Sequence, residues 1–365
     1  MTNLKTTLHN LWRLAQHFLP SWPRSKWGRR VTITVLGLIV VSIGSMYGIA
    51  RWYMSTVDDE PQVIGASFVP SYATYFGLDA KQTLDAMLGE LHIKHLRLVS
   101  YWNSIETEPG VYNFDELDWQ FAKAEQAGAK VTLSMGLRQP RWPECHPPTF
   151  YDTSQSRTHW QPQLEKYMAA VVQRYKNSPA LQDYQVENEY FLKVFGECQN
   201  FDRQRLIDEV ALVKKLDSKH PIVITRSNNG LGIPLYAPQG DVYGVSVYKR
   251  VWDAGLSKRY LEYPQPAWYY AFMAGVQKIV QGTDMNVHEM QAEAWAPGGK
   301  TLTEISLAEQ NKSLDAARLA GRFDYGRATG VHQIDMWGAE YWYYRQQVLG
   351  DSSLWQAAVA GYANR

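Results

Sequence analysis

Cysteine and excess charge are both scarce in this chain of 365 residues. The two cysteines, Cys145 and Cys198, lie in no Cys-x-x-Cys or Cys/His cluster, so nothing supports a structural zinc site, and we expect no metal or organic cofactor. They could form one disulfide outside the cytoplasm or remain two free thiols. The formal net charge of +1 leaves no electrostatic feature that favours nucleic acid as a partner.

Three motifs of other enzyme classes are missing as well. No Gly-x-Gly-x-x-Gly follows the first predicted strand, which excludes the dinucleotide-binding fold. No Gly-x-x-x-x-Gly-Lys phosphate loop and no Gly-x-Ser-x-Gly nucleophile elbow occur either. Internal repeats and low-complexity tracts are absent. The functional residues must therefore be sought at separate places along one large domain.

Aromatic residues, in contrast, are abundant. The chain contains 14 Trp and 23 Tyr, and 45% of its residues are hydrophobic, which is enough for one large core. Aromatic faces stack on the apolar C–H faces of sugar rings, so the excess hints at a carbohydrate ligand, although most of these rings serve ordinary packing.

One long hydrophobic run occurs, at residues 31–50, and it contains no charged residue. A helix of that length spans roughly 30 Å, the thickness of the hydrocarbon core of a bilayer. Residues 1–30 carry six Lys or Arg and no acidic residue, which predicts a cytoplasmic N-terminal segment and a single membrane pass. After a linker at residues 51–61, the rest of the chain is predicted to be extracytoplasmic, either periplasmic or at the cell surface. A cleaved signal peptide is the alternative, but no clear small-x-small cleavage site is present.

From residue 62 to residue 365, short apolar runs alternate with amphipathic helical stretches. This alternation predicts parallel strands with right-handed crossovers. Eight such units in roughly 300 residues predict a (β/α)8 barrel rather than an open sheet. The expected fold class is therefore an α/β TIM barrel preceded by a single N-terminal transmembrane helix. The strands are predicted at residues 62–69, 95–102, 130–137, 183–190, 221–228, 241–248, 285–295 and 332–338.

In such a barrel, functional side chains lie at the C-terminal ends of the strands. The polar residues expected there include two carboxylates facing each other across the barrel mouth, with an arginine and a tyrosine nearby. Retaining glycoside hydrolysis requires such a pair, because one acid protonates the leaving oxygen while the other carboxylate attacks the anomeric carbon. The predicted strand-end residues are Arg97, Asn188, Glu189, Tyr248, Glu289, Glu293 and Trp337.

Three segments, in this order, resemble passages of a known group of enzymes. They are LRLVSYWNSIETEPGVYNFDELD at 96–118, LSMGLRQPRWPE at 133–144 and YQVENEYF at 184–191. The first is similar to the group's strand-two passage, the second to its strand three with a Pro-x-Trp loop, and the third to the Asn-Glu pair at strand four. The chain thus resembles the clan of glycoside hydrolases whose catalytic glutamates follow barrel strands four and seven, which includes cellulases, mannanases and β-galactosidases.

The resemblance implies a role for each strand-end residue. Glu189 would be the general acid/base, and Asn188 beside it would hydrogen-bond the 2-hydroxyl of the sugar. Arg97 would lie near the nucleophile and hold it ionised, while Tyr248 would hydrogen-bond the nucleophile from strand six. Trp337 would form the floor of the subsite for the sugar under attack.

The segment of strand seven offers two candidates for the nucleophile, Glu289 and Glu293. They lie four residues apart and would share one face of a strand. Glu289 falls at the usual exit of a barrel strand, whereas choosing Glu293 would leave Glu289 unpaired and buried in the apolar barrel, which is costly. We therefore favour Glu289 as the nucleophile, with Glu293 and Trp295 as substrate contacts on the loop above it.

Three further residues near the predicted mouth need an interpretation. Trp142 follows a Pro-Arg step in a loop, where stacking on a sugar and simple loop packing are both open. Glu187 is expected to do no chemistry, because one face of strand four cannot present both it and Asn188. His288 is expected on the face of strand seven opposite the glutamates, packed between strand and helix.

Taken together, these features predict a membrane-anchored retaining glycosidase that acts on β-glycosidic bonds of an extracytoplasmic oligo- or polysaccharide. Glu289 would attack the anomeric carbon, and Glu189 would first donate a proton and then accept one. Two alternatives stay open. One is a transglycosylase that remodels envelope polysaccharide, and the other is a non-catalytic carbohydrate-binding receptor on the same barrel.

Overall fold

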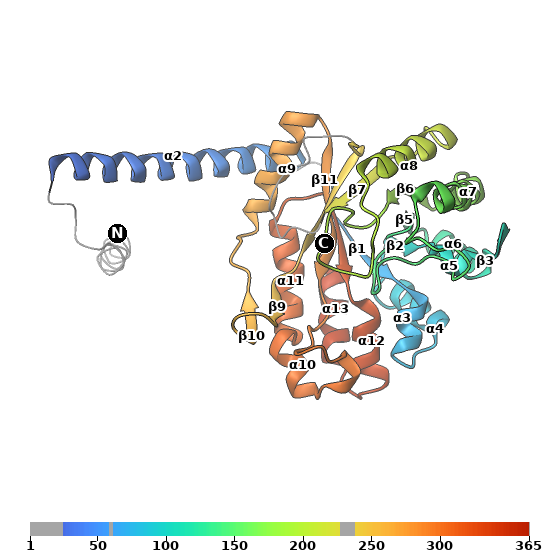
Figure 1. Cartoon of the computed structure of the whole chain (residues 1–365). Helices are drawn as coiled ribbons and strands as arrows, with labels where there is room; N and C mark the ends of the chain where they lie inside the picture. Colours follow the sequence, from blue (N-terminus) through green and yellow to red (C-terminus); the bar gives the residue numbers. More distant parts are fainter. Residues whose placement is uncertain (1–24, 58–60, 227–237, 365) are drawn as a thin grey trace. The chain divides into compact units, whose positions relative to one another are not determined.

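The computed structural model describes residues 25–57, 61–226 and 238–364 (Figure 1). The chain divides into two compact units, residues 1–48 and residues 49–365. Most of the basic N-terminal segment, residues 1–24, lies outside the described residues. Helix α2, Lys26–Val57, includes the predicted membrane span, and it is the one helix in the described part of the chain that is long and apolar enough to cross a membrane.

Within the second unit, the last turns of α2 pack on helix α9, Trp268–Gln281. The backbones approach closely at Gly275, where a Cβ atom would lie 2.7 Å from Cγ2 of Ile49. Tyr53 on the same helix is fully buried. Residues 49–57 of α2 are therefore part of the packed second unit.

Eight parallel strands close into a barrel in the spatial order β1-β12-β11-β8-β7-β6-β5-β2. Most of their residues are buried, as expected for strands covered by helices outside and side chains inside. All eight predicted strands and the (β/α)8 fold are confirmed. The strands are β1 Val63–Phe68, β2 His95–Val99, β5 Lys130–Met135, β6 Leu181–Val186, β7 Ile222–Arg226, β8 Val242–Val247, β11 Asp284–Gln291 and β12 Gln333–Trp337.

Helices connect the strands and surround the barrel (Figure 1). Helix α8 begins where Asp202 accepts a hydrogen bond from the backbone N–H of Gln204, and α6 ends where Gly128 adopts a left-handed conformation. The helices are α3 Pro70–Tyr75, α4 Ala80–Gly89, α5 Trp102–Ile105, α6 Asp115–Ala127, α7 Arg157–Tyr175, α8 Arg203–Leu216, α10 Leu307–Ser313, α11 Ala316–Ala328, α12 Ala339–Gln347 and α13 Ser353–Ala363, with a 3-10 turn at Leu302–Glu304.

Two short hairpins extend the loops at the C-terminal end of the barrel. Strands β3 (Glu106–Glu108) and β4 (Val111–Tyr112) pair after β2, and strands β9 (Arg250–Asp253) and β10 (Arg259–Glu262) pair after β8. Both hairpins are antiparallel and stand apart from the barrel sheet. They enlarge the end of the barrel at which the strand-end side chains gather.

Deep in the barrel, near the start of the strands, a histidine and a carboxylate form a buried pair. Nδ1 of His95 lies 2.6 Å from Oδ1 of Asp335, and its Nε2 contacts the hydroxyl of Thr132. Burial alone lowers the pKa of His95, but the carboxylate of Asp335 raises it, and the net pKa is above its ordinary value. Gly65 leaves the room for this pair, since a Cβ there would lie 2.3 Å from Asp335.

Candidate active site

A cavity of about 970 Å³ opens at the C-terminal ends of the barrel strands. Barrels of this kind hold their active sites at this end, and ligand pockets measure roughly 300–1,000 Å³. Its walls come from the loops after β1, β2, β5, β6, β8 and β11 and from the end of β12. The predicted site residues that line it are Trp142, Glu189, Tyr248, Glu289, Glu293, Trp295 and Trp337.

The carboxylate of Glu289 in strand β11 is held on both of its oxygens. Nη1 of Arg97 lies 2.8 Å from Oε1, and the hydroxyl of Tyr248 donates to Oε2 at 2.7 Å. All three side chains come from different strands or strand ends, and the arginine and the carboxylate are fully buried. A charge-assisted bond from a buried guanidinium is among the stronger hydrogen bonds in proteins. Glu289 is thereby fixed as an oriented anion.

Strand β11 contains a β-bulge directly at this carboxylate. Val287 pairs with Val245 of β8, but the next pair is Glu289 with Ser246, so β11 has one residue more than its neighbour here. In a bulge two residues face one partner, and the alternation of side chains is interrupted. Consecutive residues 288 and 289 can therefore both reach the barrel interior.

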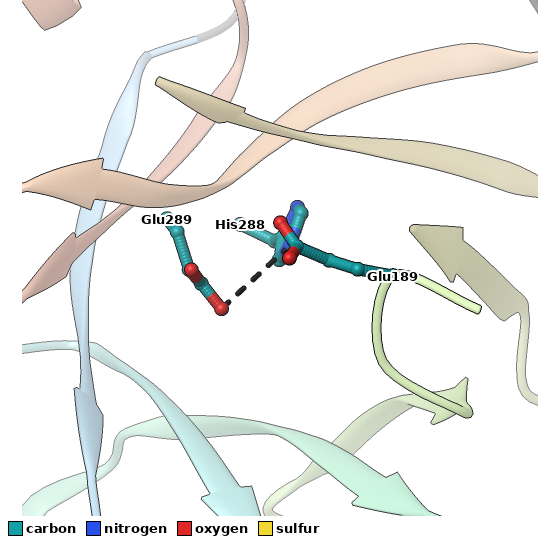
Figure 2. Close-up of side chains that lie close together, drawn as sticks. All are labelled: Glu189, His288 and Glu289. Atoms are coloured by element: carbon teal, nitrogen blue, oxygen red, sulfur yellow. Dashed lines mark ion pairs between the residues drawn. The ribbon is translucent and has the colours of Figure 1, made fainter. Parts of the chain in front are cut away.

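His288 consequently does not lie on the opposite face of the strand, and the sequence-based expectation for it was wrong. Its Nε2 lies 3.8 Å from Oε1 of Glu289 and 3.9 Å from Oε1 of Glu189, and Figure 2 shows the imidazole beside both glutamates. Burial lowers the pKa of His288 well below its ordinary value, and the charge of Arg97 lowers it further. The imidazole between the glutamates is thus neutral.

Glu189 follows strand β6, and its carboxyl group approaches His288 and Glu289 from the other side of the cavity. Its backbone adopts a φ of 43°, a left-handed conformation that non-glycine residues seldom take outside functional sites. The hydroxyl of Ser246 donates to its carboxyl group, and its backbone N–H donates to Thr225 at 2.9 Å. Burial raises the pKa of Glu189 well above its ordinary range, and the negative charge of Glu289 raises it further.

Asn188 lies at the centre of a hydrogen-bond network beneath the pair. Its Oδ1 accepts from Arg97 at 2.8 Å and from Gln185 at 3.1 Å. Its Nδ2 donates to Glu144 at 3.1 Å, and Glu144 also pairs with Arg138 at 3.3 Å. No sequence signal marked Glu144 as a site residue, although it stands in the segment that resembles the clan's strand-three loop.

Glu293 lies beyond the end of β11, on the loop above Glu289. It forms an ion pair with Arg141 at 2.7 Å and accepts from the hydroxyl of Tyr72 at 3.1 Å. The guanidinium of Arg141 is stacked between the rings of Tyr72 and Trp337, at 3.4 and 3.8 Å from their centroids. One face of Trp337 is therefore covered by a cation. No sequence signal marked Arg141 for this position.

Two exposed rings form an edge of the cavity on the side of Glu189. Trp142 is 61% exposed, and it packs edge-to-face against Phe195, which is 41% exposed, at 5.8 Å. A disulfide between Cys145 and Cys198 joins the two loops that carry these rings. On the opposite side, Trp295 packs edge-on against Tyr248 at 5.8 Å.

Glu187 points away from this site, as expected. Its two oxygens accept from the backbone N–H groups of Leu137 and Arg138, and it forms a buried ion pair with Arg205 at 2.8 Å. This carboxylate therefore binds the loop after β5 to the loop after β6. Its function is structural, because both of its carboxylate oxygens are bound by groups of the protein itself.

One group within the described residues has the spacing of metal ligands, namely Glu189, His288 and Glu289, whose ligand atoms all lie within 4.8 Å of one another. However, the oxygen of Glu289 nearest to His288 is the same Oε1 that pairs with Arg97. A divalent cation there would lie next to a guanidinium, and like charges repel. The arrangement suits a pair of carboxyl groups better than a metal centre.

Comparison with known proteins agrees with this geometry. The model of glycoside hydrolase family 42, described as β-galactosidase, matches residues 79–206, a segment that contains Arg97, Asn188 and Glu189 and ends before Glu289. No curated protein matches the chain. The family match therefore covers about a third of the sequence. This part includes the glutamate after the fourth barrel strand but not the glutamate of the seventh.

Solved structures of glycosidases share the fold at low identity. A GH5_18 enzyme from Bifidobacterium longum subsp. infantis has 11% identity over 83% of this chain and 79% of that chain, with a TM-score of 0.55. A family 10 endo-β-1,4-xylanase from Gloeophyllum trabeum has 16% identity over 83% and 96%, with a TM-score of 0.54. A GH5_18 from Streptomyces cattleya, in complex with GlcNAc, has 14% identity over 76% and 70%, also with 0.54. The solved structures share the barrel fold, and the family match agrees with the predicted clan and with the predicted enzyme class, a glycosidase.

Proposed function

We propose that this glycosidase is a membrane-anchored retaining enzyme that hydrolyses β-glycosidic bonds of an extracytoplasmic oligo- or polysaccharide. The observation that carries the proposal is the short gap between Glu189 and Glu289, which have carboxylate oxygens within 4.8 Å of each other. Carboxyl groups stand about 5–5.5 Å apart in retaining glycosidases and roughly 6.5–9.5 Å apart in inverting ones, where a water must fit between them.

In the first step, Glu289 attacks the anomeric carbon and a glycosyl ester forms as the bond to the leaving oxygen breaks. Arg97 and Tyr248 hold the two oxygens of Glu289, so the attacking atom is oriented before the sugar arrives. Glu189 gives its proton to the leaving oxygen. Its raised pKa, caused first by burial and then by the charge of Glu289, keeps that proton available near neutral pH.

In the second step, a water molecule attacks the anomeric carbon and releases Glu289. Glu189 is now a carboxylate, and it takes the proton from that water. The ester has removed the negative charge of Glu289, so one of the causes of the raised pKa of Glu189 is gone, and the hydroxyl of Ser246 stabilises the anion. The same carboxyl group can therefore act as an acid first and as a base afterwards.

Anchoring in a membrane is supported by α2 and by the basic residues that precede it. A cytoplasmic N-terminus with an extracytoplasmic barrel follows from the excess of Lys and Arg in residues 1–30. The disulfide between Cys145 and Cys198 fits this topology, because disulfides persist in oxidising compartments and are rare in the cytoplasm.

Covalent labelling tests the proposal directly. The detergent-solubilised full chain is incubated with a panel of activated 2-deoxy-2-fluoro β-glycosides, and the digested peptides are analysed by mass spectrometry. We expect a glycosyl adduct on Glu289 with at least one sugar, and none in the matched variant Glu289→Gln. An adduct on Glu293 would reassign the nucleophile, and products with inverted anomeric configuration would overturn the retaining mechanism.

Transglycosylation is a second candidate, favoured by the exposed pair Trp142 and Phe195 on the side of Glu189. Leaving groups and acceptors occupy that side, and aromatic faces stack on sugar rings. A transferase would form longer oligosaccharides from a β-oligosaccharide donor, and Trp142→Ala would shift its products towards hydrolysis. Hydrolysis products alone, at every acceptor concentration, would exclude this second candidate.

A further inference from the structure

A third carboxyl group, that of Glu144, belongs to the same cavity and has no part in the two steps above. It lies in the loop after β5, lines the cavity and is almost completely buried. Burying a carboxylate is unfavourable unless the protein provides partners for it. The burial of Glu144 in the cavity that also holds Glu189 and Glu289 therefore calls for a physical explanation.

The loop is built around this side chain. Glu144 adopts a φ of 74°, in the left-handed region that a non-glycine residue seldom occupies. Gly196, on the loop after β6, leaves the space for it, because a Cβ at Gly196 would lie 2.7 Å from the Cβ of Glu144. The next residue, Cys145, is bonded to Cys198 on that same loop. Glu144 is thus held at a fixed place by both loops.

The contacts of Glu144 determine how the amide of Asn188 is oriented. A carboxylate can only accept hydrogen bonds, so Nδ2 of Asn188 must face Oε2 of Glu144, at 3.1 Å. Oδ1 of Asn188 then faces Arg97 at 2.8 Å and Gln185 at 3.1 Å. Since Arg97 also holds Glu289, an unbroken chain of hydrogen bonds joins Glu144 to the proposed nucleophile.

We propose that Glu144 is a positioning residue of this active site: its carboxylate fixes the amide of Asn188, which contacts Arg97 and through it the proposed nucleophile Glu289. The inference rests on the proposed function, because it assigns Glu144 a part in holding the acid/base ready. Glu144 touches no reacting atom. It acts through Asn188 and through its charge.

The charges around Glu144 support this role. Burial raises its pKa to about 7, Arg138 opposes that rise, Glu289 adds to it, and Asn188 and Arg97 favour the ionised form. In turn, Glu144 raises the pKa of Glu189, after burial and Glu289, whereas Ser246 and Arg138 lower it. When Glu289 is esterified and uncharged, the charge of Glu144 still acts on Glu189. It keeps Glu189 basic enough to take the proton from water.

The test measures the ionisation of Glu189 in two independent ways on the detergent-solubilised full chain. The first is the pH profile of kcat/KM for an aryl β-glycoside, whose alkaline limb reports loss of the proton from Glu189. The second is a 13C NMR titration of glutamate labelled at Cδ, in which the signal of Glu189 is identified by its disappearance in Glu189→Gln. The NMR titration requires no activity.

Glu144→Gln keeps the size of the side chain and removes its charge. We expect the alkaline limb and the titration of Glu189 to move to lower pH by about one unit. Ser246→Ala removes a hydrogen bond that favours the ionised form, so it should move both in the opposite direction. Glu144→Asp keeps the charge and should leave the limb in place, as should Glu108→Gln, an exposed site that controls for net charge.

If Glu144→Gln does not fold, the NMR titration is made in Glu289→Gln, where the charge of Glu289 no longer acts on Glu189, and Glu189 should still titrate in more than one step because Glu144 remains. A single-step titration of Glu189 in Glu289→Gln, or an unmoved limb in folded Glu144→Gln, overturns the inference and leaves the proposed function intact. A displaced NMR titration in a chain that hydrolyses no glycoside supports the inference about Glu144 and overturns the proposed function.

Discussion

Two fully buried histidines lie near opposite ends of the barrel, and each is close to a carboxylate. His95, at the start of β2, lies 2.6 Å from Asp335, which offsets the effect of burial and leaves the pKa of this histidine raised. His288, in the second half of β11, lies 3.8 Å from Glu289, yet burial and then Arg97 leave its pKa well below the ordinary value.

The two histidines differ in whether the neighbouring carboxylate is already paired with another cation. Asp335 faces His95 directly, so the pair forms one internal salt bridge that ties β2 to β12. Glu289 is already paired with Arg97, so a second cation is not needed there and His288 stays neutral. The pair of His95 and Asp335 thus contributes to stability, whereas the pair of Arg97 and Glu289 at the mouth keeps a carboxylate oriented for chemistry.

The largest expected effect comes from removing the carboxylate at the mouth. We expect Glu289→Gln to lower kcat/KM by about 10⁴-fold or more, because the proposed nucleophile is lost. The melting temperature should fall as well, because the buried guanidinium of Arg97 loses its charged partner. Glu293→Gln, the matched change four residues on, should cost about tenfold at most, mainly in KM. Equal losses in the two variants would contradict the assignment of the nucleophile. Steady-state kinetics and thermal melts on the same preparations provide both readouts.

Removing the carboxylate at the deep end should lower stability without lowering activity. Asp335→Asn leaves His95 buried without its counter-ion, and breaking a buried pair in this way costs about 3 kcal/mol of unfolding free energy. Activity per folded molecule should be retained. Asp284→Asn, which breaks the exposed pair with Lys278, should cost well under 1 kcal/mol, as surface pairs do. Urea unfolding followed by tryptophan fluorescence distinguishes the two, and equal costs would show that the deep pair is not special.

The pH dependence of stability should have opposite slopes for the two histidines. The raised pKa of His95 contributes stability that is complete below the unfolded-state pKa, about 6.5, and is lost as the pH rises through the folded-state pKa. The lowered pKa of His288 does the opposite, since its contribution is complete above about 6.5 and is lost as the pH falls.

Each slope is at most about 1.4 kcal/mol per pH unit. Melting temperatures measured from pH 5 to pH 9 should therefore lose their alkaline decline in Asp335→Asn and part of their acid decline in His288→Asn. If the alkaline decline were unchanged in Asp335→Asn, the raised pKa of His95 would have no bearing on stability.

The smallest expected effect concerns the catalytic pH profile of His288→Asn. Asparagine is neutral at every pH, so if His288 is also neutral in the working enzyme, both limbs of the kcat/KM profile should stay in place. The rate itself should fall by about tenfold or less, from altered packing between the glutamates. A limb that moves would show that His288 carries charge during turnover.

The strands and the strand-end residues were predictable because the signals for them are local. Apolar runs mark each strand, and the barrel rule then brings Arg97, Tyr248 and Glu289 together although they are far apart in the sequence. The position of His288 was not predictable, because a bulge has no signature in residue types and reverses the alternation on which the expectation rested.

The loop residues Arg141 and Glu144 were missed for a different reason. Both have φ angles in the left-handed region, 80° and 74°, which non-glycine residues adopt only when the surrounding structure imposes it. Their partners, Glu293 and Asn188, come from loops more than 40 residues away. Such placement depends on tertiary packing and on the disulfide, neither of which a local pattern encodes.

The bulge in β11 gives this strand one residue more than β8 has over the same stretch. Pairing with β8 resumes immediately, Met290 with Val247, but it is shifted by one residue relative to the pairs before the bulge. An alignment with a barrel that lacks the bulge must open a one-residue gap inside the strand. Without that gap, the acidic residue of the other protein would fall opposite His288 or Met290, and the site would look as though it had lost its carboxylate.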